Sequence, residues 1–124
     1  MSNFIWVAFG GAVGASLRFF SSSFIKTIYP NFPFSTLFVN ILGSFIIGLL
    51  MNYLEYKNIS ENFIRYFLII GLLGSYTTFS TFSFDAVDLI NNRKFLLSFF
   101  YIFLSVSSCI LFAFLGHNIN KIQF

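Results

Sequence analysis

The sequence predicts an all-α membrane protein with four transmembrane helices, and three observations support this fold class. Of its 124 residues, 57% are hydrophobic, 23% are aromatic and only 9% are charged, whereas a water-soluble domain carries about 25% charged residues. Four apolar spans are each long enough to cross a hydrocarbon core about 30 Å thick. The connections between the spans are short, so we expect a single domain over residues 1–124. The spans are 4–25, 34–54, 66–84 and 95–116.

The same composition excludes several classes of protein. Seven Lys and Arg residues against four Asp and Glu residues leave a net charge of only +3, which does not indicate a nucleic-acid partner. The single cysteine, Cys109, excludes a secreted domain held together by disulfides. No Lys or Arg precedes the first apolar run, which argues against a cleaved signal peptide. So apolar a chain is not a soluble enzyme, and we expect membrane lipids around it.

The first span contains one charged residue, Arg18, which follows the small residues 10–16. A charge at this depth costs about 2.5 to 3.5 kcal/mol on insertion scales, so Arg18 faces protein or water. Two interpretations remain open: Arg18 extends from the helix end to the lipid headgroups, or it is a fixed positive charge in an aqueous vestibule. The first two spans contain no acidic residue. This absence favours an anion as the transported species if there is a vestibule.

The second span carries a polar stripe. Thr36, Asn40 and Ser44 recur four residues apart and therefore lie on one face of a helix. Such a stripe either joins helices, through hydrogen bonds of about 0.6 kcal/mol each, or lines a pore in which an Asn amide donates to an anion. Gly43 and Gly48 mark surfaces where another helix can pack closely.

The third span is unusually polar in its middle, because residues 71–83 include two glycines and six Ser or Thr residues. These residue types are poor helix formers and predict a break in the helix near residues 74–78. The alternative is a continuous helix whose hydroxyls bond back one turn, and the sequence leaves both open. Unwound backbone at this depth must be buried in protein or line a cavity. Its carbonyls could bind a small hard cation such as Na⁺.

Two aromatic residues, Phe79 and Phe82, lie three residues apart next to this polar segment and share a helix face. Aromatic rings have a positive edge, so ring edges can stabilise an anion weakly enough for its release. Simple packing is the alternative for any pair of Phe residues in so aromatic a chain. Asp85 and Asp88 fall at the end of the span, where we interpret them as solvated at the membrane interface.

The fourth span repeats the stripe pattern. Tyr101, Ser105 and Cys109 are spaced four residues apart, with Ser108 beside them. This face either packs against another helix or lines a path. We expect the Cys109 thiol to be buried and inert, because apolar surroundings disfavour a thiolate.

The distribution of cations gives the chain almost no preferred orientation in the membrane. Lys57, Arg65 and Lys121 on one side balance the three cations predicted for the other side, leaving out Arg18. Either the insertion machinery resolves this weak bias, or both orientations are made and form an antiparallel homodimer with a two-fold axis in the membrane plane. Four short helices leave little room for an aqueous path within one chain. This size favours the dimer.

Three motifs together resemble one known family. They run from Gly10 to Arg18, from Ser35 to Phe45 and from Gly74 to Phe82. In these segments, in length and in the four-span layout, essentially the whole chain is similar to the bacterial Fluc (CrcB-like) fluoride ion channels. The resemblance implies a dual-topology antiparallel homodimer in the cell (plasma or inner) membrane. It implies a passive, non-enzymatic export of F⁻ that entered as HF, through two pores, and hence fluoride resistance.

The resemblance also implies roles for individual residues. Arg18 becomes a vestibule charge, and the backbone carbonyls of Gly74 and Thr77 would bind a structural Na⁺ at the dimer interface. On the fourth helix, Ser108 would take the place of Cys109 as a pore residue. The implied fluoride pore residues are Phe79, Phe82, Asn40, Thr36, Ser80, Tyr101, Ser105 and Ser108.

Two rival functions belong to other classes. A small proton-coupled multidrug antiporter is also a four-helix dimer, but it needs a carboxylate buried in the membrane, and no acidic residue lies in the middle of the first three spans. The other rival is a membrane subunit that transports nothing and whose polar stripes only bind partner helices. Measured anion flux distinguishes all three.

Overall fold

The computed structural model describes residues 2–58 and 61–122, and almost all of them are helical. The helices are α1 (Ser2–Ile28), α2 (Phe34–Lys57), the π-helix η1 (Phe63–Leu73), α3 (Gly74–Tyr76), α4 (Phe79–Asn91), α5 (Phe95–His117) and α6 (Ile119–Ile122). Four segments are long and apolar enough to cross a membrane: α1, α2, the segment Phe63–Asn91 that contains η1, α3 and α4, and α5. These findings confirm the all-helical class with four long apolar helices and indicate a multi-pass membrane protein.

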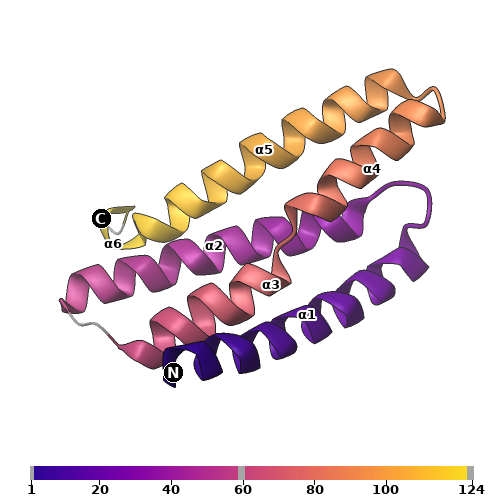
Figure 1. Ribbon diagram of the computed structural model, residues 1–124. Coiled ribbons are helices and arrows are strands. Elements are labelled where there is room, and N and C mark those ends of the chain that lie inside the picture. The colour runs from indigo at the N-terminus through magenta and orange to yellow at the C-terminus, as the bar shows by residue number, and fades with distance from the viewer. Residues whose placement is uncertain (1, 59–60, 123–124) are drawn as a thin grey trace.

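The four long segments lie side by side and alternate in direction (Figure 1). The start of α1, the end of α2, the start of η1 and α6 lie at one end of the molecule. The connections from α1 to α2 and from α4 to α5 lie at the opposite end. The two largest contacts pair α1 with η1 and α2 with α5.

Glycines bring α1 and η1 into close contact. A Cβ atom on Gly14 would collide with the carbonyl of Leu72, and one on Gly10 would collide with the carbonyl of Phe67. Small residues in membrane helices allow this backbone-to-backbone approach, because without side chains the two helices gain van der Waals contact along their length. This contact therefore depends on shape, and larger residues cannot replace these glycines.

Another pair of glycines joins α2 to α5. Gly48 faces the carbonyl of Ala113, and Gly116 faces the carbonyl of Phe45, so a Cβ atom on either glycine would collide with backbone. At the same end of the molecule, the Glu55 carboxylate lies 3.3 Å from the Nε2 atom of His117. The two helices are thus joined by close packing and by the contact between Glu55 and His117 near their ends.

The buried core that positions the candidate site lies where α2, α4 and α5 meet. It consists of Leu37, Phe82, Ala86, Leu89 and Tyr101. Tyr101 is completely buried. On the outside of the bundle large apolar residues are exposed instead, as a protein surrounded by acyl chains requires.

Candidate ion pathway

The third membrane segment is interrupted between α3 and α4 by two residues with extended backbone. Thr77 has φ −80° and ψ 154°, and Thr78 has φ −150° and ψ 121°. The Oγ1 atom of Thr78 accepts a hydrogen bond of 3.2 Å from the backbone N–H of Thr81, so Thr78 is the N-cap of α4. The interruption is visible in Figure 1 as the thin non-helical segment that joins α3 to α4.

The side chain of Asn40 on α2 pairs with this extended backbone. Its Nδ2 atom donates to the Thr78 carbonyl over 3.0 Å, and its Oδ1 atom accepts from the Thr78 N–H over 2.7 Å. The amide thus satisfies both backbone groups of one residue, as a neighbouring strand would. Gly43 makes room for this contact, because a Cβ atom there would collide with the side chain of Thr77.

These bonds deprive two carbonyl groups of their helical donors. In a continuous helix the Thr78 N–H would donate to the Gly74 carbonyl, but it donates to Asn40 instead. In the same way the Thr81 N–H donates to the Oγ1 atom of Thr78 and not to the carbonyl of Thr77. Both carbonyls therefore have acceptor capacity that the helix would otherwise use.

A cavity of about 230 Å³ lies beside the interruption. Its lining combines an amide, hydroxyls, a thiol and two aromatic rings, and it therefore offers polar donors within a membrane-spanning bundle. The lining residues are Asn40, Ser44, Thr77, Thr78, Phe79, Phe82, Ser105, Val106 and Cys109. The cavity thus brings together four of the predicted pore residues: Asn40, Phe79, Phe82 and Ser105. It also brings Ser44 of the second-span stripe to Cys109 of the fourth-span stripe.

The two Phe residues of the cavity differ in their surroundings. Phe82 is 8% exposed and belongs to the core, whereas Phe79 is 76% exposed in the single chain. Their ring centroids lie 5.4 Å apart, and the ring planes meet at 56°. Phe82 is therefore held by its neighbours, and Phe79 lies on the side of the cavity that this chain leaves open.

Ser105 has a buried hydroxyl without a hydrogen-bond partner in the described part of the chain. The residue is 4% exposed, and its Oγ atom has no hydrogen-bond partner among the described residues. An unsatisfied buried hydroxyl is unfavourable by about 1 to 3 kcal/mol. A ligand or water in the cavity that Ser105 lines would offset this loss.

Asp85 makes two contacts that the sequence analysis did not foresee. Its Oδ2 atom accepts a hydrogen bond of 2.7 Å from the Oγ1 atom of Thr36 and one of 3.1 Å from the hydroxyl of Tyr101. It therefore links α4 to α2 and α5, whereas Asp88 is exposed. The available signal was spacing, because Asp85 follows Phe82 by three residues and so lies on the same face of the helix.

The structure does not bring every predicted residue to the cavity. Thr36 and Tyr101 bond to Asp85 instead, and Ser80 is exposed, with its Oγ atom 3.2 Å from the Oγ1 atom of Thr78. Arg18, half-buried on α1, is not among the lining residues.

On α5 the cavity is lined by Cys109, not by Ser108 as we expected. The reason is helical periodicity, because residues four apart keep the face that Ser105 occupies.

Comparisons with known proteins agree with the three sequence motifs. A family model described as CrcB-like protein, Camphor Resistance (CrcB), matches residues 5–117. A relative from Hydrogenobaculum sp. is 46% identical over 100 residues, covering 81% of this chain and 82% of the relative. One from Campylobacter fetus is 40% identical over 121 residues, covering 96% of this chain and 94% of the relative.

A third relative, from Campylobacter jejuni, is 41% identical over 122 residues, which is 98% of this chain and 99% of the relative. All three relatives carry the name fluoride-specific ion channel FluC. Since both the family model and these relatives cover most of the chain, the protein belongs to the CrcB-like family.

Proposed function

We propose that this protein is a fluoride-selective passive ion channel, not an enzyme, which exports F⁻ across the cell (inner) membrane and gives fluoride resistance. The observation that carries the proposal is the cavity beside Thr77 and Thr78, where an amide, hydroxyls and two Phe rings meet inside a membrane-spanning bundle. The names of the relatives support fluoride as the ion. The cavity supplies donors that replace the water shell of a small anion.

The contacts of the individual residues suggest what each contributes to anion conduction. One hydrogen of the Asn40 amide is used by the Thr78 carbonyl, and an amide group has two, so the other can donate to an anion. The unsatisfied hydroxyl of Ser105 provides a further donor. Phe79 and Phe82 would present ring edges, which attract an anion without binding it tightly. Thr36, Ser80 and Tyr101 would continue the polar path, and Arg18 would attract anions from a vestibule.

Efflux from liposomes tests this function. Purified protein is reconstituted with fluoride or chloride inside, and ion release is started with a potassium ionophore. We expect fast fluoride efflux, slow chloride efflux and no dependence on a proton gradient. Proton-coupled uptake of a cationic drug would instead identify the antiporter, and the absence of any flux would identify a subunit that transports nothing.

We further propose that the working unit is an antiparallel homodimer surrounded by lipid. One chain leaves the cavity open on the side of Phe79, which is 76% exposed. A second copy of the chain would cover Phe79 and close this side. The balanced cation count agrees with insertion in both orientations.

Orientation locking tests the dimer. Two or three Lys residues added to one set of loops should fix the orientation and lower the flux, and a copy locked in the opposite orientation should restore it. Full flux from a uniformly oriented population would refute the antiparallel arrangement.

We propose that the dimer contains a structural Na⁺ bound by backbone carbonyls. The groups fit this role, because the Gly74 and Thr77 carbonyls have lost their helical donors to Asn40 and Thr78, and hard cations bind oxygen ligands. Two carbonyls are too few to surround a cation, and a two-fold axis would bring four together. Replacing Na⁺ by a large organic cation during purification should lower the thermal stability of the dimer. Unchanged stability in its absence would contradict this assignment.

A further inference from the structure

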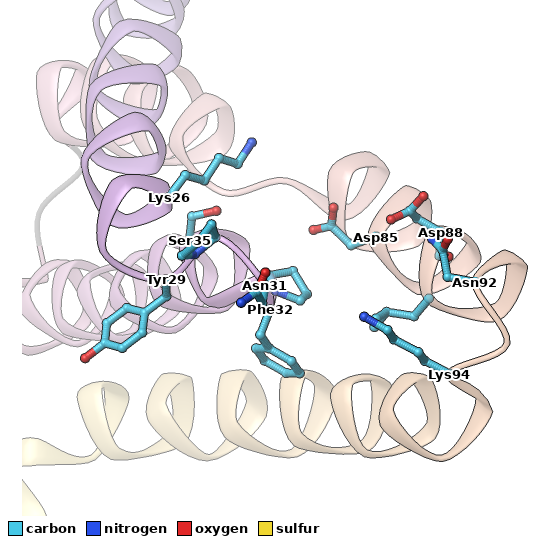
Figure 2. Close-up of a pocket in the computed structure, with 12 residues that line it drawn as sticks. Lys26, Tyr29, Asn31, Phe32, Ser35, Asp85, Asp88, Asn92 and Lys94 are labelled. Carbon is cyan, nitrogen blue, oxygen red and sulfur yellow. The ribbon is translucent and has the colours of Figure 1, made fainter.

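A second cavity, of about 270 Å³, lies at the end of the molecule where α1 is joined to α2 and α4 to α5. Lys26, from the last turn of α1, and Lys94, at the start of α5, line it. Figure 2 shows the two lysines on different elements, with Asp85 of α4 between them and Asp88 farther along α4, next to Asn92. We name this cavity the charged mouth.

Asp85 of the charged mouth is bonded to two residues of the proposed polar path. The same carboxylate accepts the hydrogen bonds from Thr36 and Tyr101. The Tyr101 ring lies 5.4 Å from the ring of Phe82, which lines the pathway cavity. On α4 the two cavities are therefore separated by one helical turn, about 5 Å.

A carboxylate at this point would repel an anion. The hydroxyls of Thr36 and Tyr101 donate to Asp85, and they leave the negative charge in place. Lys26 and Lys94 can offset it, because no salt bridge within 4 Å engages either lysine in the described part of the chain. Two lysines and two aspartates also make the charged mouth neutral overall, which suits an ion that must be released.

The helix ends add a smaller contribution of the same sign. The N-terminal caps of α2 and α5 are Pro33 and Lys94, and both line the charged mouth. Neither helix has a side-chain cap for its first N–H groups, which carry partial positive charge. An anion in this cavity would therefore meet both ammonium groups and the partial positive charge of two helix N-termini.

We propose that the charged mouth is an opening of the anion pathway, where Lys26 and Lys94 capture a small anion and offset the charge of Asp85. The inference rests on the proposed channel function. It assigns a binding site for the permeating anion at the loop end of the bundle, outside the cavity that contains the Phe residues.

Ionic strength makes the inference testable. The double variant Lys26→Gln/Lys94→Gln leaves two carboxylates uncompensated, so fluoride efflux at low salt should fall about tenfold, the lower range of electrostatic steering effects. The defect should largely disappear at about 300 mM salt, where screening is much stronger than at about 10 mM. The variant Asp88→Asn should change low-salt efflux in the opposite direction, because it makes the charged mouth net positive.

Arg93→Asn is the matched control. Arg93 is exposed and adjacent to Lys94, but it does not line the charged mouth. Its φ of 59° suits Asn, so the variant removes one charge at the same end without straining the turn. Its efflux should stay close to wild type at both salt concentrations.

The outcomes separate the inference from the function it rests on. A wild-type protein without fluoride efflux would refute the channel, and the inference with it. Efflux by the double variant that equals wild type at low salt would refute the charged mouth alone, as would an equal loss in Arg93→Asn. A double variant that does not fold would be replaced by the two single Lys→Gln variants, each compared with itself at both salt concentrations.

Discussion

Two contacts between apolar helices are made in different ways. One joins α1 to η1, and the other joins α2, α4 and α5. The first depends on Gly10, Gly14 and Gly71, which bring backbone against backbone. The second contains the partly buried polar bonds of Asn40 and Asp85. Close packing holds the bundle together in the membrane, whereas the polar contact is where an ion can be bound.

The largest expected effect breaks the close-packed region. Gly14→Ala places a methyl group against the carbonyl of Leu72, so we expect destabilisation at the upper end of overpacking, about 3 kcal/mol. Gly11→Ala is the control, since its Cβ atom would meet only the Ser75 hydroxyl at 3.3 Å. Thermal unfolding in detergent measures both. Equal stability of the two variants would contradict the importance of backbone contact here.

The polar region should be weakened next by Asn40→Ala. This change leaves the N–H and the carbonyl of Thr78 without the partners they have now. Because the adjoining cavity admits water, we expect the lower end of the cost of unsatisfied groups, about 1 kcal/mol each and about 2 kcal/mol for the two. We expect lower thermal stability together with loss of fluoride efflux. Normal stability would mean that the interruption between α3 and α4 does not depend on this amide.

Phe82→Ile should separate function from folding. Isoleucine fills much of the same buried space, so the dimer should remain intact, while loss of a ring interaction of up to about 1.5 kcal/mol should lower fluoride efflux about tenfold. Phe99→Ile is the control, because Phe99 is 62% exposed. Wild-type efflux in Phe82→Ile and Phe79→Ile would remove the rings from the pathway.

Cys109 gives a chemical test of the same cavity. It is the single cysteine of the chain, and Ag⁺ binds a thiol by displacing its proton, so silver should reduce fluoride efflux by more than about half if the cavity is on the path. The variant Cys109→Ser should resist silver. Silver inhibition of that variant would show that the metal acts elsewhere.

The smallest effect is expected for Ser105→Ala. The Ser105 hydroxyl has no partner among the described residues, so its removal should not lower the thermal stability and could raise it, because an unsatisfied buried hydroxyl is unfavourable. If it donates to fluoride, efflux should fall about threefold, because one hydrogen bond in a membrane protein contributes about 0.6 kcal/mol. Unchanged efflux would mean that Ser105 does not donate a hydrogen bond to fluoride.

The close-packed and polar regions also differ in how far they could be predicted. The stripe of Thr36, Asn40 and Ser44 was evident from the spacing of these residues. Spacing could not reveal that Asn40 meets Thr78, which is 38 residues away, or that Thr36 meets Asp85, which is 49 residues away. The bond between Asp85 and Tyr101 could not be predicted for the same reason.

The amino-acid sequence by itself determined the four apolar helices, the family motifs and which polar residues share a helix face, because hydrophobic length and helical period are local properties. The tertiary structure alone decided which faces meet. Close approach at the glycines sets the position and rotation of each helix. That rotation brings Asn40 to the backbone of Thr78, Asp85 to Tyr101, and Cys109 rather than Ser108 to the cavity.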